Sequence, residues 1–452
     1  MPNVLWKHIG IAAATLGGLV VSVAILWGLY GSSLARPEQW LPQDTVALIS
    51  EATSETQALL RQAFPLLSTL PTLDPTATAA LVKTPEGRLG WIVFTPRVQV
   101  GGNPYEIEAA PDARALIMER EESLEDAPAY RTLVNDRSTL GTWVFLNADE
   151  RQETPWPWLK LSEPVGLVFT SDEIRMSVVS EGSPLISIFR AQLPSAFASP
   201  LFVLSLPEAS DMLRVPSAVE GSIISIGKGL ATTWIKEVLG TAISPTYDLS
   251  PLTRQQILLH LAQDSGGRTL AVLEGSAPRD TVDAFSEKVF ASFKASLPLG
   301  KRETRTFDDS FTFDLITQDA SALIEETKSV NGWSVRSMKH AASQKALLFA
   351  SDGTEFLLSN DEAALLVRIA QTLPPTPLPD AGGQLLAAGR FNSTQLTTFL
   401  GQSLPSFWKT SLSLPNELQG DLVWTVTRER GRVTLQVQRL KIQDTGKIKA
   451  QR

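Results

Sequence analysis

The chain has 452 residues, with 40 Lys plus Arg against 48 Asp plus Glu, so its formal net charge at pH 7 is -8. Hydrophobic residues make up 43% of the chain and charged residues 19%, which indicates folded domains rather than a disordered protein. The chain has no cysteine, and this excludes disulfides, thiolate zinc sites, iron–sulfur clusters and thiol nucleophiles. The acidic balance argues against nucleic acid as a partner.

The first feature along the chain is an apolar run without charges at positions 9 to 30. A helix of this length reaches about 33 Å, enough for a bilayer core of about 30 Å. We therefore predict a short cytoplasmic stub and a transmembrane signal anchor within residues 1–35. The residues assigned to the anchor are Ile9, Gly18, Ser22, Trp27 and Tyr30, which include small residues for helix packing and aromatic rings for the headgroup level.

The flanking charges predict the orientation of this segment. Lys7 precedes it, whereas Arg36 is followed by Glu38 and Asp44, so we expect a single-pass protein of the cell membrane with a cytoplasmic N-terminus and an extracytoplasmic body. The alternative is a secretory signal cleaved after Ala35, where small residues suit a signal peptidase. The length of the apolar run favours the anchor, because the apolar region of a secretory signal is shorter.

The rest of the sequence indicates two unequal copies of one unit, at about 41–190 and 193–442, followed by a basic tail at 443–452. Each copy opens with Leu-Pro and an apolar strand, and each ends in a strand–turn–strand pattern. The matched segments are 46–49 with 200–204, 90–96 with 269–275, 114–118 with 354–358, and 164–180 with 420–438. Their shared order, more than any one match, predicts the repeat.

The second copy is enlarged by an insertion at about 216–264. We expect two amphipathic helices there, over 220–240 and 252–264, the latter with Ile257, Leu258 and Leu261 on one face. A further amphipathic helix is predicted over 280–297, and the proline-rich stretch 372–383 predicts a surface loop.

Alternation of apolar and polar residues in the strands, as at Val433, Leu435 and Val437, predicts antiparallel sheets with one face on a core and one face in water. The amphipathic helices would cover the dry face. The predicted fold class is α+β: an N-terminal transmembrane helix followed by two related antiparallel-sheet units layered with helices.

Several segments together resemble a known family. They are the apolar anchor, the opening Leu-Pro-Gln-Asp-Thr-Val (41–46), the stretch SLEDAPAYR (123–131) with the apolar strand after it, and the late hairpin. They resemble a large bacterial family of membrane-anchored, extracytoplasmic proteins that is catalogued as a domain of unknown function. The resemblance covers nearly all of the body and implies location and fold. This chain is shorter than we expect for the family, chiefly in the first unit, and the resemblance carries over no catalytic residues.

Candidate catalytic and metal-binding residues are few. The three histidines, His8, His260 and His340, do not have the spacing of a metal site, and we predict structural or surface roles for them. Ser225 and Lys228 have the spacing of a Ser-x-x-Lys motif, but its companion motifs are missing. The acidic clusters at 119–126 and 308–309 would serve glycoside hydrolysis only across a cleft, and solvated helix starts explain them better.

The segment Asp264-Ser265-Gly266-Gly267 resembles the sequence around the nucleophile of chymotrypsin-like proteases. We interpret it instead as a glycine stop at the end of a helix. We assign no catalytic, cofactor-binding or metal-binding residue in the chain.

We therefore expect a non-enzymatic envelope scaffold or protein-interaction module, attached to the membrane by its N-terminal helix and bound to an envelope protein. The alternative is a carrier for a lipid or another hydrophobic ligand, which needs an apolar cavity of several hundred cubic ångströms between sheet and helices. A hydrolase is the least favoured hypothesis, because it requires a nucleophile and a base to converge in a cleft.

Overall fold

The computed structural model describes residues 36–97, 104–119, 122–136, 141–147, 163–180, 192–206, 224–239, 243, 257–297, 302–307, 311–316, 323–341, 343–379, 383–403, 419–429 and 431–440. The chain divides into two compact units. The first comprises Met1–Gln57, Leu70–Arg131 and Thr142–Asn147, and the second comprises Ala58–Thr69, Thr132–Gly141 and Ala148–Arg452.

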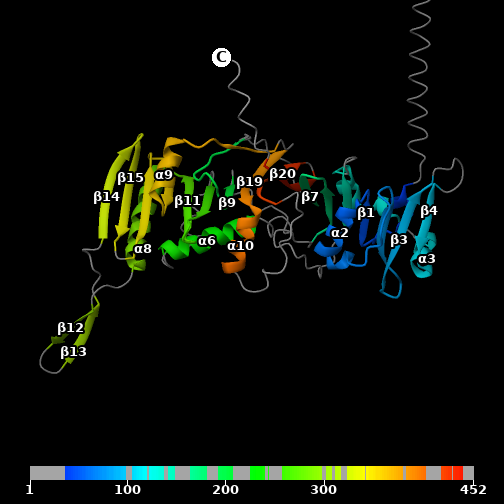
Figure 1. Ribbon diagram of the computed structural model, residues 1–452, viewed down its shortest axis with the longest axis horizontal. Helices are drawn as coiled ribbons and strands as arrows, with labels where there is room; N and C mark the ends of the chain where they lie inside the picture. The colour runs from blue at the N-terminus through cyan, green and yellow to red at the C-terminus, as the bar shows by residue number, and fades with distance from the viewer. Residues whose placement is uncertain are drawn as a thin grey trace, which may run out of the picture. The chain divides into compact units, whose positions relative to one another are not determined.

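The first unit contains a five-stranded antiparallel sheet in the order β5-β1-β2-β3-β4 (Figure 1). Its strands are β1 (Ala47–Ser50), β2 (Thr78–Lys83), β3 (Leu89–Pro96), β4 (Tyr105–Ala109) and β5 (Thr142–Leu146). The rings of Tyr130, Trp143 and Phe145 pack together in its core, and the Tyr130 hydroxyl donates to buried Glu38. β1 is buried along its whole length because it has a neighbour strand on both sides and apolar side chains on both faces.

Helices in this part of the sequence are short. They are η1 (Pro37–Gln39), α2 (Ser54–Ala63), η2 (Pro65–Leu67), α3 (Pro111–Glu119), η3 (Leu124–Asp126), α4 (Pro128–Leu133) and η4 (Val134–Asp136). α3 packs closely on β3, because a Cβ added at Gly90 would lie 3.1 Å from the Cβ of Ala113.

The second unit contains a twelve-stranded antiparallel sheet in the order β6-β7-β21-β20-β19-β9-β10-β11-β17-β16-β15-β14. The strands are β6 (Val165–Phe169), β7 (Glu173–Val179), β9 (Phe202–Leu206), β10 (Ile257–Gln263), β11 (Thr269–Ser276), β14 (Leu323–Val330), β15 (Trp333–His340), β16 (Lys345–Ser351), β17 (Glu355–Ser359), β19 (Gln384–Asn392), β20 (Asp421–Glu429) and β21 (Arg432–Arg439). Two separate strand pairs are β8 (Gln192–Leu193) with β18 (Thr376–Pro377), and β12 (Arg302–Phe307) with β13 (Phe311–Ile316).

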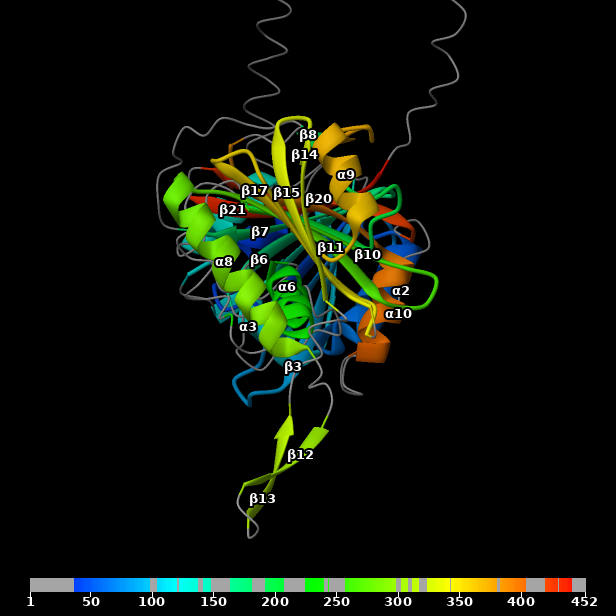
Figure 2. The same ribbon diagram turned by 90° about the vertical axis from the view of Figure 1, so that its left-hand side faces the viewer.

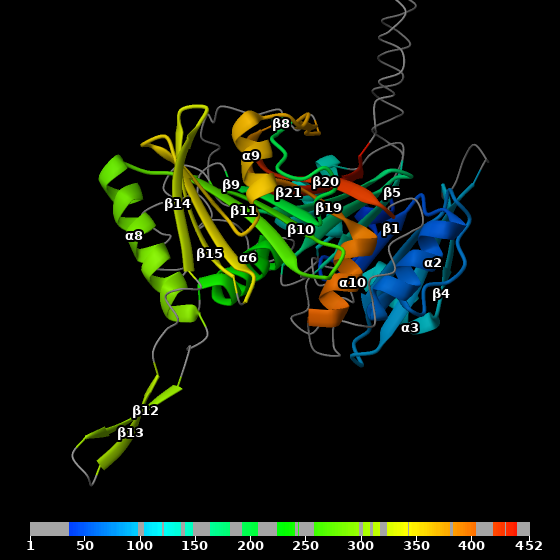
Figure 3. The ribbon, with the colours of Figure 1, turned by 60° about the vertical axis from the view of Figure 1, so that its left-hand side comes forward.

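Helices cover both faces of this sheet (Figure 3). The helices are α6 (Ser225–Leu239), α8 (Arg279–Ser296), α9 (Glu362–Ala370) and α10 (Ser393–Ser403). On one face α9 packs on Val272, Leu348 and Leu357. On the other face the Phe285 ring of α8 packs on the rings of Phe349 and Phe356, and α6 lies against β9. The sheet is therefore the middle layer of the second unit.

We predicted that one face of the sheet is exposed to water. This prediction is wrong in the centre of the second unit, because strands such as β10 and β19 are buried at successive positions. Two element predictions are also wrong, and burial on both faces explains the first of them. The segment 252–264, predicted as a helix with Ile257, Leu258 and Leu261 on one face, contains β10, since a short apolar run fits a buried strand as well as a helix. The segment 114–118, predicted as a strand, lies in α3.

Other predicted elements are confirmed. The helix over 280–297 is α8, with Val282, Phe285, Val289 and Phe293 buried. The helix over 220–240 is α6, and the segments 164–180 and 420–438 form the hairpins β6–β7 and β20–β21. The described part of the proline-rich stretch is mostly exposed and contributes β18.

The predicted fold class is wrong as a whole. Seventeen of the described strands form antiparallel sheet, five in the first unit and twelve in the second, and the described helices are few, so the described chain is predominantly β-sheet. The transmembrane segment with Ile9, Gly18, Ser22, Trp27 and Tyr30 lies outside the described residues, as does the tail 443–452.

In the described part of the chain, no helix combines the length and the apolar character needed to cross a membrane. The longest of them, α8, has 18 residues with charges on every turn. This finding contradicts two predictions. One is the single-pass signal anchor, and the other is the cell-membrane location with an extracytoplasmic body.

The two units share a strand order. The series β5-β1-β2-β3-β4 corresponds to β19-β9-β10-β11-β17, and every neighbouring pair in both series is antiparallel. The hairpin β6–β7, which we predicted to close the first copy, pairs with β21 and belongs to the second unit. The boundaries 41–190 and 193–442 stay predictions.

Candidate functional site

The open edge of the second unit's sheet is β14, which faces the viewer in Figure 2. β14 pairs with β15 along its whole length, and the described residues contain no strand on its other side. Asn331 and Gly332 join the two strands with left-handed φ angles of 51° and 86°, the conformation of a two-residue type I′ turn. This turn sets the register of the hairpin.

The turn also decides which backbone groups of β14 point outward. The pair Val330–Trp333 flanks a two-residue turn and is therefore hydrogen-bonded, and hydrogen-bonded pairs alternate with non-hydrogen-bonded pairs along an antiparallel ladder. The even-numbered residues of β14 thus bond to β15. The N–H and C=O groups of Leu323, Glu325, Thr327 and Ser329 are directed away from the sheet.

An ion-pair network holds β14 on the face that α8 covers. Arg336 of β15 donates to Glu325 through Nε at 2.8 Å and Nη2 at 2.6 Å, and to Glu287 of α8 through Nη1 at 2.6 Å. The Arg336 guanidinium lies 4.3 Å from the centre of the Phe290 ring, a cation–π contact. The hydrogen bond from Arg336 lowers the pKa of Glu325, so this carboxylate is ionised at neutral pH.

A second network lies on the α9 face. Glu362, the first residue of α9, accepts from Lys328 of β14 at 2.5 Å and from Lys339 of β15 at 2.7 Å. These two hydrogen bonds and the lysine charges lower the pKa of Glu362 to about 2. The position also suits a carboxylate because the N-terminus of a helix carries partial positive charge.

Two side chains on the same face of β14 are left without such contacts. Ile324 is 48% exposed, one of the exposed large hydrophobic residues of the described chain. Glu326 is exposed and forms no ion pair with the described residues, although its charge helps to raise the pKa of Lys339. The edge therefore offers open backbone groups, an apolar side chain and a carboxylate that forms no ion pair with the described residues.

A cavity of about 90 Å³ lies at one end of this sheet, beside the β14–β15 turn. Glu274, Trp333, Glu355, Arg368 and Gln371 are among the residues that line it. Cavities for small-molecule ligands are several times larger, at about 300–1,000 Å³. The cavity is therefore too small and too polar for a lipid chain.

Two of the lining residues, Glu274 and Arg368, belong to a buried chain of three polar side chains. His260 of β10 is fully buried, and its Nε2 lies 3.0 Å from Oε1 of Glu274 on β11. Arg368 of α9 donates to both Glu274 oxygens, through Nε at 2.5 Å and Nη2 at 2.9 Å. Burial raises the pKa of Glu274, but the hydrogen bond from His260 and the charge of Arg368 outweigh it, and the pKa is lowered.

This arrangement fastens α9 to the sheet. The Nδ1 atom of His260 has no hydrogen-bond partner among the described residues, so no described hydroxyl is activated there. His340 lies 2.7 Å from Ser343 through Nδ1, which also accepts from the Ser343 backbone N–H. That contact spans three residues within the β15–β16 turn, and we interpret it as turn structure.

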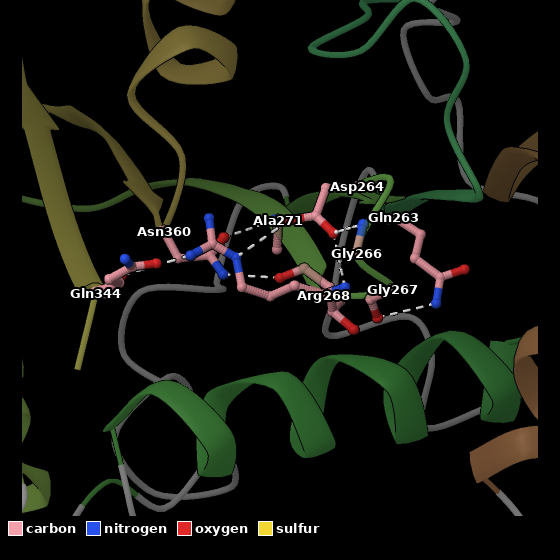
Figure 4. Close-up of polar contacts among 9 residues, drawn as sticks. Gln263, Asp264, Gly266, Gly267, Arg268, Ala271, Gln344 and Asn360 are labelled. Atoms are coloured by element: carbon pink, nitrogen blue, oxygen red, sulfur yellow. Dashed lines mark hydrogen bonds and ion pairs between the residues drawn. The ribbon is translucent and has the colours of Figure 1, made fainter.

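The protease-like segment proves to be a hairpin turn between β10 and β11 (Figure 4). The carboxylate of Asp264 accepts from the backbone N–H groups of Gly266 at 2.9 Å and Arg268 at 2.8 Å, and Gly267 has a φ of 81°. We predicted a glycine that ends a helix. The glycine does have a structural role, but it shapes a hairpin turn and not a helix end.

The first unit has the same turn between β2 and β3. There Thr84 takes the place of Asp264, its hydroxyl accepts from the N–H of Arg88 at 3.2 Å, and Gly87 has a φ of 77°. Because the equivalent turn has no Ser-Gly-Gly segment, the Asp-Ser-Gly-Gly sequence is explained by backbone geometry alone.

The remaining candidates do not converge. Lys228 lies exposed in α6, which begins at Ser225. Asp126 accepts from Ser123 at 2.7 Å and from Arg131 at 2.6 Å, as a local cap and ion pair. Among the described residues, no group of three or more His, Asp or Glu side chains could hold a metal ion. His8 and the pair 308–309 lie outside the described residues.

Sequence reasoning missed β14 and the Glu274–Arg368 pair. The Asn331-Gly332 dipeptide between two alternating segments is a strong hairpin signal and could have revealed β14. Glu274 and Arg368 are 94 positions apart and carry no local signal. Comparison of the chain with models of protein families, with curated proteins and with solved structures found no match.

Proposed function

We propose that this chain is a non-enzymatic interaction module that binds an extended polypeptide strand at the open edge of β14. The observation that carries the proposal is the row of outward backbone groups at Leu323, Glu325, Thr327 and Ser329. Strand addition to such an edge gives affinity through main-chain hydrogen bonds and specificity through alternate side chains.

The surroundings of β14 support this role. The Arg336–Glu325 and Lys328–Glu362 contacts hold the strand from both faces, so the edge is ordered before a partner arrives. A preordered edge lowers the entropic cost of binding. β14 also has no proline and no bulge in its pairing with β15, two devices that commonly block open edges.

The two other hypotheses have less support. A carrier needs an apolar cavity several times larger than the cavity of about 90 Å³ beside Trp333. A hydrolase needs a nucleophile near a base, and the contacts of His260 and His340 are explained by helix docking and turn structure.

The proposal is tested with Thr327→Pro, which removes an outward N–H without removing a ladder bond to β15. Thr327→Val is the matched control, because it keeps the N–H and the branched side chain. In crosslinking capture from a native extract, we expect a stoichiometric partner with the wild type and with Thr327→Val, and loss of it with Thr327→Pro.

Hydrogen exchange on the captured complex identifies the binding edge. The amides of Glu325 and Thr327 should exchange slowly only in the complex, whereas the amide of Lys328, bonded to β15, should change little. Equal capture by Thr327→Pro and wild type, or unchanged exchange at Glu325 and Thr327, would contradict the proposal.

A further inference from the structure

We propose that the strand that pairs with β14 is β14 of a second copy of this chain, so that the protein forms a twofold dimer by joining two sheet edges. This inference rests on the proposed function and names its partner. The argument depends on which residues would lie opposite one another.

The outward backbone groups restrict the register. They belong to odd-numbered residues, so two copies can pair antiparallel only with odd residues opposite odd residues. If the twofold axis passes through Thr327, Thr327 lies opposite Thr327 of the second copy and Glu325 lies opposite Ser329. These are hydrogen-bonded pairs, each exchanging two N–H···O=C bonds.

The same register makes the side chains complementary. Glu326 lies opposite Lys328 and Ile324 opposite Val330, and the twofold axis repeats both pairs. These are non-hydrogen-bonded pairs, in which Cα atoms are about 4.5 Å apart and side chains are closest. All four side chains lie on the α9 face, because even-numbered residues share one face of a strand. The exposed Ile324 and Glu326, which has no ion-pair partner among the described residues, both gain partners.

Neighbouring registers lack this complementarity. An axis through Glu325 or Glu326 places that glutamate opposite its own copy, and an axis through Lys328 places two lysines opposite each other. Like charges directly opposite in a sheet are unfavourable. An axis through Ser329 pairs Lys328 with Val330 and leaves Glu326 without a charged partner.

Lys328 can take part without leaving Glu362 unpaired. Glu362 is shared between Lys328 and Lys339, so these three groups carry a net charge of +1. The Glu326 carboxylate of a second copy brings a negative charge to this cluster. Lys339 keeps Glu362 paired even where Lys328 turns toward the second copy.

The test is sedimentation velocity of the full chain with two charge variants. In Glu326→Lys, positions 326 and 328 are both lysine, and in Lys328→Glu they are both glutamate. Each variant alone should raise the dissociation constant of the dimer by about tenfold or more, because the twofold axis repeats each like-charge contact. An equimolar mixture should restore the dimer as a heterodimer, since every lysine then faces a glutamate.

Glu108→Lys is the matched control, because Glu108 is an exposed glutamate on β4, the last strand of the first unit's sheet. It should leave the wild-type dissociation constant unchanged. Circular dichroism checks that each variant is folded, and the double variant Glu326→Lys/Lys328→Glu should dimerise alone.

A wild type that stays monomeric at all concentrations, or a dimer that both charge variants leave intact, would overturn the self-pairing. Failure of the mixture to recover the dimer would also overturn it. If the chain is monomeric but Thr327→Pro still abolishes capture of a different protein, the self-pairing fails and the proposed function stands. If Thr327→Pro has no effect in either assay, both fail.

Discussion

Replacing Arg368 by methionine tests whether the buried Glu274–Arg368 pair fastens α9 to the sheet. Methionine has a similar length and keeps the apolar contacts of the arginine stem. The side chains of Arg368 and Glu274 are 15% and 14% exposed, and both Glu274 oxygens accept from Arg368. The variant leaves Glu274 with His260 as its remaining partner.

We expect Arg368→Met to lower the free energy of unfolding by about 3 kcal/mol, the lower end for breaking a buried ion pair, since this pair keeps some contact with water. Adding Glu274→Gln should recover about half of the loss, because the buried charge is then removed. Arg279→Met is the control. Arg279 and its partner Asp283 are 78% and 67% exposed, and exposed pairs contribute little.

The pH dependence gives a second, independent readout. In the wild type the pKa of Glu274 is lowered below its ordinary value of 4.5, so its stabilising contribution is present above that value and is lost as the pH falls. Without Arg368, burial still raises the pKa of Glu274 and the charge and hydrogen bonds of Arg368 no longer lower it, so the pKa is higher in the variant than in the wild type. The stability difference between wild type and variant should therefore shrink as the pH falls below the ordinary value.

Urea unfolding at neutral pH and near the ordinary carboxyl pKa measures both effects. A loss as small as that of the Arg279→Met control, or a difference that does not change with pH, would refute the account of Glu274 as an ionised, buried anchor.

Three further outcomes are expected. Gly389→Ala should destabilise the fold by about 3 kcal/mol or more, because its Cβ would lie 2.1 Å from a carbonyl oxygen and 2.5 Å from an indole ring. The control is Gly229→Ala, which has open space in α6 and should be neutral or slightly stabilising; thermal melts measure both variants. Glu362→Gln should cost about 1 kcal/mol at neutral pH, a modest value because the group is partly exposed. The pKa of Glu362 is about 2, so the wild-type advantage should fade between the ordinary carboxyl value and pH 2, and an unchanged advantage there would contradict the lysine contacts. Asp264→Ala should cost about 1–2 kcal/mol through two lost backbone hydrogen bonds, and Ser265→Ala should cost almost nothing; the reverse order in urea unfolding would show that the turn is misinterpreted.

The local pattern of the sequence determined those elements whose residues carry their own signal. The helix over 280–297 has apolar residues at spacings of three and four and becomes α8. The hairpin β20–β21 follows from two strand-like segments on either side of a tight turn, the second of which alternates at Val433, Leu435 and Val437. Such signals depend on near neighbours, so one chain segment is enough to reveal them.

Only the tertiary structure decided the identity of β10, the burial of both sheet faces and the position of the open edge. The apolar residues Ile257, Leu258 and Leu261 fit a helix face, but β9 and β11 supply hydrogen-bond partners on both sides and make this segment a strand. The pair of Glu274 and Arg368 depends in the same way on α9 lying over β11. β14 is an edge because β15 is the only described strand that pairs with it. That property belongs to the assembled sheet and not to residues 323–330 alone.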